Sequence, residues 1–292
     1  MFVIRDLILF WEKTDGNTTI SNLSSNGIDL HVDNFRIVIY LVMIIKRNLK
    51  ICIMSQFTPE QVSELNDKLK TPEEVLQWGI ENIHPKLALA SSFGAEDVCV
   101  IHMLSKINPE ARVFSLDTGR INQETYDVMD EIRKKYNTKI EITFPDATEV
   151  IEMVQTHGMN LFYESAENRK MCCGVRKVHP LNKMLGTLDG WITGLRSDQT
   201  QNRQSSAKIE IDEQHDGMIK LNPILDWSWE QTMGYIKEND IPYNKLIDQG
   251  FPSIGCEPCT RAVKPGEDLR AGRWWWENQS DKECGLHMDH SK

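Results

Sequence analysis

The chain has 292 residues, a formal net charge of −10 at pH 7 and a pI near 5.3. Its 40% hydrophobic and 26% charged residues are ordinary for a soluble globular protein with a full core. The acidic balance excludes a general nucleic-acid binder and a protein that adheres to anionic membranes, so an anion must bind at a local basic patch. Seven cysteines, an odd number without a secretory signal, argue against a disulfide framework and favour metal, cluster or redox chemistry in the cytoplasm.

Residues 1–53 differ from the rest of the chain because they contain no Ala, Pro or Gln. Their apolar run, Ile37–Ile45, is shorter than the roughly 20 residues that a membrane span needs. It also lies behind Asp29 and Asp33, too far along for a signal-peptide core. A membrane-surface anchor or a partner-binding segment is one interpretation. We favour upstream sequence translated from an early start, with Met54 as the natural first residue.

Regular periodic segments begin after Ser55. Thr58 and Thr71 each precede a Pro and acidic residues, which predicts two helix starts. We expect strands over Leu87–Ala90, Arg112–Leu116, Lys139–Phe144 and Trp191–Thr193, and helices over Val98–Leu104, Gln123–Tyr136 and Ala147–His157. This alternation predicts an α/β fold, a doubly wound parallel sheet with helices on both faces. Ligands bind beyond the carboxyl ends of such strands, so function should lie in the loops Ser91–Asp97, Asp117–Arg120 and Gly194–Arg203.

Two pairs of cysteines, Cys172-Cys173 and Cys256-Glu257-Pro258-Cys259, can hold zinc or an iron–sulfur cluster. A zinc knuckle wraps both sulfurs of a pair around one ion, which adjacent cysteines do poorly. Neighbouring residues can ligate different irons of a cluster, so we favour the cluster over zinc. A buried pair at Cys172-Cys173 and a redox pair at Cys256 and Cys259 stay open as alternatives.

Cys284 lies alone in Glu283-Cys284-Gly285-Leu286-His287, near the end of the chain. A thiol on a short tail suits a nucleophile better than a structural ligand, and His287 or nearby arginines would favour its thiolate. The alternative is an idle, exposed cysteine. Cys99 lies in an apolar helical run and is expected in the core.

Cations gather beside the cysteines of this acidic chain. They are Arg169, Lys170, Arg176 and Lys177 near the first pair, Arg261, Lys264, Arg270 and Arg273 after the second, and Arg196 and Arg203 in a strand-end loop. Guanidinium groups bind phosphate or sulfate bidentately and lysine adds a point charge, so this set predicts an oxyanion site. The backbone of Ser92–Asp97 can also cradle an anion, although its sequence is not a Walker A loop.

Together these segments resemble the adenylyl-sulfate/phosphoadenylyl-sulfate reductase family, from about Met54 to the end of the chain. The matching segments are Ser92-Phe93-Gly94-Ala95-Glu96-Asp97, Leu116-Asp117-Thr118-Gly119-Arg120, Cys172-Cys173-Gly174-Val175-Arg176-Lys177, Gly194-Leu195-Arg196-Ser197-Asp198-Gln199, Gly255-Cys256-Glu257-Pro258-Cys259-Thr260-Arg261 and Glu283-Cys284-Gly285-Leu286-His287. The paired-cysteine motifs resemble those of the assimilatory, cluster-containing branch, which prefers adenosine 5′-phosphosulfate (APS). The branch without them uses the 3′-phosphorylated nucleotide (PAPS).

The resemblance implies an adenine nucleotide alpha hydrolase-like (PP-loop type) fold with a C-terminal catalytic tail. The loop at Ser92 departs from the Ser-Gly-Gly-x-Asp-Ser signature, which argues against ATP cleavage. The expected parts are the leader 1–53, a nucleotide-binding α/β domain over 54–255, and a cluster-binding loop with the catalytic tail over 256–292. The implied site has one 4Fe-4S cluster on Cys172, Cys173, Cys256 and Cys259, catalysis by Cys284 and His287, and substrate binding by Ser92, Gly94, Asp117, Thr118, Gly119, Lys177, Arg196, Arg203, Arg270 and Arg273.

The implied reaction is the thioredoxin- or glutaredoxin-dependent reduction of APS to sulfite and AMP through a Cys284 thiosulfonate, in cytoplasmic sulfate assimilation. No nucleic-acid or membrane partner is expected. A PAPS reductase or a dual-substrate enzyme is the nearest alternative. An RNA-thiolating protein of the same fold is disfavoured because its pyrophosphatase loop and basic surface are missing. A zinc-stabilised binding module is a further alternative, and the oligomeric state stays open, a homo-oligomer included.

Overall fold

The computed structural model describes residues 2–4, 7–14, 17–23, 57–199 and 206–277. The chain divides into two compact units, Met1–Met54 and Ser55–Lys292. In the first unit, β1 (Phe2–Ile4), β2 (Leu7–Thr14) and β3 (Asn17–Leu23) form an antiparallel three-stranded sheet. The composition of residues 1–53 does not predict these strands.

The second unit alternates strands and helices. Its strands are β4 (Leu87–Ala90), β5 (Arg112–Leu116), β6 (Ile140–Thr143), β7 (Gly190–Ile192), β8 (Ile209–Asp212) and β9 (Met218–Leu221). Its α-helices are α2 (Pro59–Lys68), α3 (Pro72–Ile83), α4 (Ala95–Ile107), α5 (Gln123–Tyr136), α6 (Ala147–His157), α7 (Ala166–Cys173), α8 (His179–Leu185) and α9 (Trp229–Glu238). Shorter helical turns are η1 (Leu161–Tyr163), η2 (Gly174–Val178), η3 (Ser197–Gln199), η5 (Glu213–His215), η6 (Ile247–Gln249) and η7 (Glu257–Cys259).

The six strands of this unit form one sheet in the order β6-β5-β4-β7-β9-β8. All neighbouring pairs are parallel except β8 and β9, which are antiparallel. The central strand β4 pairs with β5 on one side and with β7 on the other, where Leu87 lies opposite Gly190. The four strands expected from the sequence are confirmed, and β8 and β9 extend the sheet beyond them.

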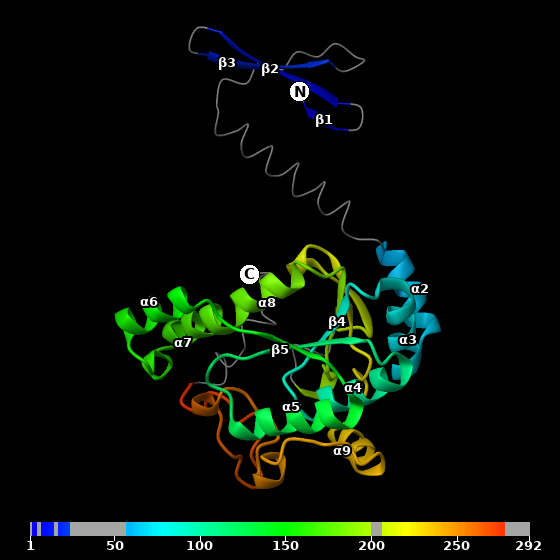
Figure 1. Ribbon diagram of the computed structural model, residues 1–292, viewed down its shortest axis with the longest axis vertical. Helices are drawn as coiled ribbons and strands as arrows, with labels where there is room; N and C mark the ends of the chain where they lie inside the picture. Colours follow the sequence, from blue (N-terminus) through cyan, green and yellow to red (C-terminus); the bar gives the residue numbers. More distant parts are fainter. Residues whose placement is uncertain (1, 5–6, 15–16, 24–56, 200–205, 278–292) are drawn as a thin grey trace. The chain divides into compact units, whose positions relative to one another are not determined.

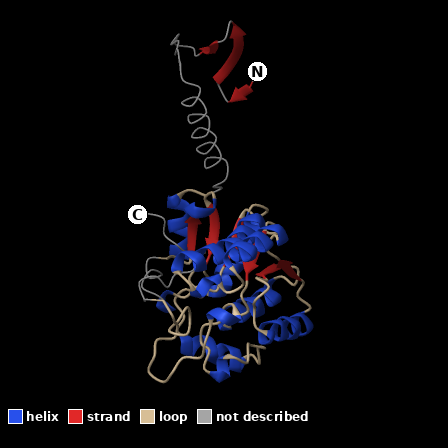
Figure 2. Cartoon of the chain, turned by 90° about the vertical axis from the view of Figure 1, so that its left-hand side faces the viewer, coloured by secondary structure: helices blue, strands red, loops and turns tan. Residues whose placement is uncertain are grey.

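Each face of the sheet has its own core because alternate residues of a strand point to opposite sides. Leu87 and Leu89 of β4 pack with Val113 of β5 against α3, α4, α5 and α9. Ala88 and Phe114, their neighbours in sequence, pack against α8 instead. Helices therefore lie on both faces, as Figures 1 and 2 show, and the predicted doubly wound α/β fold is confirmed.

The two helix starts predicted from threonine are confirmed. The side chains of Thr58 and Thr71 accept hydrogen bonds from the backbone N–H groups of Gln61 at 3.3 Å and Glu74 at 3.2 Å. The side chains of Gln61 and Glu74 accept in return from the threonine N–H groups at 2.8 and 2.9 Å. Each helix thus begins with a capping box, which satisfies N–H groups that have no partner within the helix.

The segment from α7 to α8 is not predicted by the sequence pattern. Cys172 and Cys173 end α7, and the single π turn η2 carries Arg176 and Lys177 into α8. Such turns occur often at functional sites because they turn a side chain out of helical register. Among the described residues, no helix combines the length and the apolar character that a membrane crossing requires.

Candidate functional site

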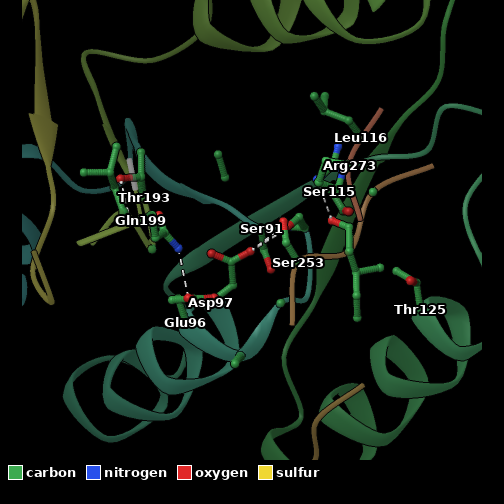
Figure 3. A pocket seen from close by; sticks show the side chains of 18 of the residues that line it. Ser91, Glu96, Asp97, Ser115, Leu116, Thr125, Thr193, Gln199, Ser253 and Arg273 are labelled. Carbon is green, nitrogen blue, oxygen red and sulfur yellow. Dashed lines mark hydrogen bonds between the residues drawn. The ribbon is translucent and has the colours of Figure 1, made fainter. Parts of the chain in front are cut away.

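A cavity of about 300 Å³ lies beyond the carboxyl ends of β4, β5 and β7. Residues of all three strand-end loops line it, and residues 252–256 and 268–273 of the C-terminal segment supply another part of its wall. Figure 3 shows the polar side chains of Ser91, Ser115, Thr193 and Ser253 around this space. A doubly wound sheet binds its ligand at this position.

The carboxylate of Asp97 holds the loop between β4 and α4. Its Oδ2 accepts hydrogen bonds from the backbone N–H and the hydroxyl of Ser92, at 2.6 and 2.9 Å. Between them, buried Phe93 has a left-handed backbone (φ 57°), which is strained for a residue with a side chain. The hydrogen bonds between Ser92 and Asp97 therefore fix the loop from which Ser92 and Gly94 line the cavity.

Asp97 itself lies in an unusual electrostatic environment. Burial raises the pKa of its carboxyl to about 6, and Glu96 raises it further, although the hydrogen bonds from Ser92 act in the opposite direction. Gly194, after β7, comes so close that a Cβ there would lie 2.3 Å from Asp97 Oδ1. The sequence does not single out Asp97, because an acidic residue in the first turn of a helix is commonly solvated.

Arg196 is buried in an ion-pair network at the cavity wall. Its Nε lies 2.9 Å from Glu96 Oε1 and its Nη1 lies 2.7 Å from Asp198 Oδ2, with 2% of the side chain exposed. Gln199 donates to the same oxygen of Glu96 at 2.9 Å, as Figure 3 shows. Arg196 lines the cavity, but its charge is balanced by two carboxylates, so here it joins the loop after β7 to α4.

The residues of the loop after β5 have different roles. Thr118 lines the cavity, whereas Asp117 and Gly119 are not among the lining residues. Asp117 shapes the turn, because Gly119 N–H donates to its Oδ1 at 2.7 Å and the Tyr126 hydroxyl donates to its Oδ2 at 2.8 Å. Burial raises the pKa of Tyr126 to about 12, and the hydrogen bond to Asp117 adds to this effect.

The four cysteines of the two pairs line a second, smaller cavity together. Cys172 and Cys173 end α7, Cys256 directly precedes η7 and Cys259 ends it, so segments far apart in sequence meet here. The cationic side chains of Arg176, Lys177 and Arg273 line the same cavity. Within the described part of the chain, no three His, Cys, Asp or Glu side chains form a group that could hold a single metal ion. Four soft thiols surrounded by cations fit a group that thiolates ligate at separate points and that carries negative charge.

Three of these thiols, Cys172, Cys256 and Cys259, differ in the direction of their pKa shifts. Burial raises the pKa of Cys172, and burial together with the charges of Cys256 and Cys173 raises that of Cys259 to about 12. Burial acts in the same direction on Cys256, but Lys177, a hydrogen bond with Thr118 and Arg273 outweigh it and lower its pKa. The Sγ of Cys256 lies 3.2 Å from the Thr118 hydroxyl.

The two cavities share one wall. Lys177, Cys256 and Arg273 line both of them, and Arg270 lines the larger one. Arg273 donates from Nη1 to the carbonyl oxygen of Ile254 at 3.2 Å, and its buried Nε has no hydrogen-bond partner within the described chain. A Cβ on Gly255 would lie 2.3 Å from Arg273 Nη2, so the glycine leaves room for this guanidinium.

Three of the expected site residues, Cys284, His287 and Arg203, lie outside the described residues. Of the others, Ser92, Gly94, Thr118, Lys177, Arg196, Arg270 and Arg273 line the larger cavity. Buried Arg169 and Trp274 line the cysteine cavity as well. The sequence places Arg169 among the cations beside the cysteines, and the structure adds Trp274 to the wall of their cavity.

The fold and this site define a family. Residues 86–262 match the phosphoadenosine phosphosulfate reductase domain, and the chain belongs to that family. It is 46% identical over 205 residues to an adenosine 5′-phosphosulfate reductase of Burkholderia cepacia, which covers 70% of this chain and 82% of that protein. It is also 41% identical over 243 residues to the chloroplastic 5′-adenylylsulfate reductase 3 of Arabidopsis thaliana, covering 80% of this chain and 52% of that protein.

A solved structure supports the fold assignment. The phosphoadenylyl-sulfate reductase of Candida auris, in a phosphate complex, superposes with a TM-score of 0.61 at 30% identity, covering 71% of this chain and 98% of that one. With the sheet order described above, this confirms the adenine nucleotide alpha hydrolase-like fold that the resemblance implies.

Proposed function

We propose that this chain reduces APS to sulfite and AMP in sulfate assimilation, with thioredoxin or glutaredoxin as the electron donor. The observation that carries the proposal is the common wall of Lys177 and Arg273 between the strand-end cavity and the four-cysteine cavity. The similar proteins of Burkholderia cepacia and Allochromatium vinosum, both named adenosine 5′-phosphosulfate reductases, support APS as the nucleotide.

The substrate lies across the strand ends in this proposal. Its adenosine contacts the loop of Ser92 and Gly94 and the loop that Asp117, Thr118 and Gly119 form. Its phosphosulfate meets Lys177, Arg270 and Arg273 in the same cavity, joined by Arg203 and His287 from outside the described residues. These cations offset the repulsion between a thiolate and a sulfate, which is worth about 3–4 kcal/mol for each key group.

Cys284 is the nucleophile. Its thiolate attacks the sulfate sulfur, the bond from that sulfur to the phosphate oxygen breaks, and AMP leaves with the electron pair. A thiol of the donor then attacks the Cys284 sulfur, and sulfite departs with the electrons of the sulfur–sulfur bond. The second donor thiol resolves the mixed disulfide, so the donor is oxidised to a disulfide while sulfate sulfur is reduced to sulfite.

We assign the four cysteines as ligands of one 4Fe-4S cluster. Cys172 and Cys173 would hold two corners, and Cys256 and Cys259 the other two, with Arg176 and Lys177 nearby. When bound, the cluster would supply fixed charge rather than electrons, because thiol exchange delivers both electrons. Lys177 is thereby fixed between the two cavities, where it faces the phosphosulfate.

The direct test looks for the covalent intermediate. The unsubstituted protein, Cys284→Ser and Cys99→Ser are mixed anaerobically with APS, without donor, and the intact masses are measured. We expect a sulfonate adduct on the unsubstituted protein and on Cys99→Ser, because Cys99 is buried in α4, and none on Cys284→Ser. An adduct of equal abundance on Cys284→Ser removes that residue from the role.

A PAPS reductase is the second candidate, because the Candida auris relative carries that name at 30% identity. Anaerobic sulfite release with APS and with PAPS at equal concentrations distinguishes the two. Faster release from PAPS assigns the chain to the second candidate, and comparable release from both nucleotides makes it a dual enzyme.

A further inference from the structure

The last described residue, Glu277, is fastened to the helix that carries the adjacent cysteines. Its Oε1 and Oε2 accept hydrogen bonds from Arg169 Nε at 2.9 Å and Arg169 Nη2 at 2.8 Å. The two side chains are 0% and 5% exposed, so the pair is shielded from solvent. Arg169 stands three residues before Cys172 on α7, which fixes this pair beside the cysteine cavity.

The chain leading to Glu277 is fixed as well. The backbones of Arg273 and Thr260 form an isolated antiparallel β-bridge. The N–H of Trp274 donates to the carbonyl oxygen of Cys259 at 3.1 Å. The N–H of Glu277 donates to the carbonyl oxygen of Trp274 at 2.9 Å, which closes one turn.

The Trp274 ring contacts residues that line the cysteine cavity and the larger cavity. The guanidinium carbons of Arg169 and Arg273 lie 4.6 and 4.7 Å from its centroid. Trp274 is buried and has a left-handed backbone with φ 42°, a strained conformation that the surrounding contacts must hold in place. The segment therefore turns at a defined point, where the Trp274 ring contacts both Arg169 and Arg273.

We propose that the Arg169–Glu277 pair positions the nucleophile by fixing the point from which the tail with Cys284 begins. This inference rests on the proposed function. Cys284 follows Glu277 by seven residues, so an extended tail reaches at most roughly 25 Å from that point. A fixed origin confines the thiol to the neighbourhood of the cavity and sets the direction from which it approaches.

The geometry of the Arg169–Glu277 pair indicates that it positions the tail rather than stabilises the fold. A buried ion pair is often no more stabilising than apolar residues of the same size, so stability alone does not account for a desolvated Arg and Glu. Two parallel hydrogen bonds do define the direction of the chain at Glu277, as a bidentate pair imposes geometry as well as attraction. Arg169 and Glu277 are positioning residues here, because they act through Cys284.

The experiment measures the first half-reaction in Glu277→Gln, which removes the charge and keeps the shape. We expect AMP release in a single turnover to slow by about 10- to 100-fold, the range for a misplaced reacting group. The dissociation constant for AMP and the iron content should stay within twofold of the unsubstituted protein. Arg169→Lys, which keeps the charge and loses the bidentate geometry, should give an intermediate rate.

Two further variants accompany it. Glu141→Gln breaks a bidentate pair of the same geometry with Arg112, at 2.7 and 2.9 Å, between β5 and β6, and should leave the rate unchanged. A Gly-Ser insertion after Glu277 keeps the ion pair but shifts Cys284 relative to its fixed origin, so it should also slow AMP release while the AMP dissociation constant and the iron content stay unchanged.

An unchanged rate in Glu277→Gln overturns the inference. So does a parallel loss of AMP affinity and iron, because that marks a structural role. The proposed function fails separately, if the unsubstituted protein forms no adduct at Cys284.

Discussion

Gly194 and Asp97 are in direct contact across two strand-end loops. A Cβ on Gly194 would lie 2.3 Å from the carboxylate oxygen Oδ1 of Asp97 and 3.1 Å from its backbone nitrogen. The backbone after β7 thus packs directly against the side chains of Glu96 and Asp97 in the first turn of α4. Residues of the two loops line the larger cavity together.

Gly194→Ala should therefore destabilise the protein by about 1–3 kcal/mol, the usual cost of an extra methyl group in a packed site. Gly234→Ala is the matched control, because Gly234 lies within α9 and its Cβ would meet open space. There the change should stabilise by up to about 1 kcal/mol, as alanine favours a helix. Urea unfolding measures both, and equal stability of the two variants would contradict the contact.

Because the pKa of Asp97 is raised in the folded protein, we expect the free energy of unfolding to depend on pH. Its carboxyl has an ordinary value of 3.8 and a folded value of about 6, so the folded state holds the proton more tightly. The stability that this group contributes is fully present below pH 3.8 and is lost as the pH rises through about 6. The free energy of unfolding should fall by about 3 kcal/mol across that window.

Asp97→Asn removes this titration. The difference in unfolding free energy between the two proteins, measured in urea from pH 4 to pH 7, should change by about 2 kcal/mol, because part of the full effect lies below pH 4. A constant difference across that range would show that the Asp97 carboxyl does not titrate there.

The Arg196 network predicts a strong dependence on both partners. Arg196→Met leaves the carboxylate of Glu96, only 13% exposed, without its cation, and should cost about 3–5 kcal/mol. Adding Glu96→Gln should recover part of that loss. Arg112→Met, at a pair that is 26% and 30% exposed, should cost about 1 kcal/mol or less. Thermal unfolding of these three variants and of the unsubstituted protein tests this order, and a double variant no more stable than Arg196→Met would contradict it.

The cysteine cavity predicts a loss of iron. Cys256→Ser removes the thiol with the lowered pKa, and anaerobically purified protein should lose most of its iron and its brown absorbance. Cys99→Ser should keep both, as Cys99 is buried in the core, where its thiol contacts the Thr232 carbonyl oxygen of α9. Zinc in place of iron in the unsubstituted protein would refute the cluster assignment.

The sequence predicts the part of the fold that depends on local pattern. The apolar runs at Leu87 and Arg112 form parallel strands, and the threonine caps begin helices where expected. Helix α7 is not predicted because its buried side chains include Arg169 and two cysteines, which break the apolar periodicity of a helix. The strands β8 and β9 form an antiparallel pair joined by a short turn, so they fall outside the strand–helix alternation on which the prediction rests.

The candidate site also has features that the sequence predicts and features that it does not. The convergence of the four cysteines follows from the spacing of the two pairs, and the structure brings all four to one cavity. The ion pair of Arg196 with Glu96 cannot be read from sequence, because a hundred residues separate the two. The burial of Asp97 likewise depends on Gly194, which only the folded chain brings into contact.

The order of strands in the sheet has a consequence for how the chain is made. β4 lies at the centre of the sheet, and its partner β7 follows about a hundred residues later. At 5–20 residues per second, a ribosome adds that stretch in about 5–20 s. During this time the edge of β4 that later pairs with β7 has no partner strand. The apolar side chains of Leu87 and Leu89 are then shielded from water mainly by α3 and α4. Slow synthesis between residues 90 and 190 should therefore lower the yield of folded protein, whereas pauses after residue 241, by which point α9 and the last buried residue of this core have been made, should not.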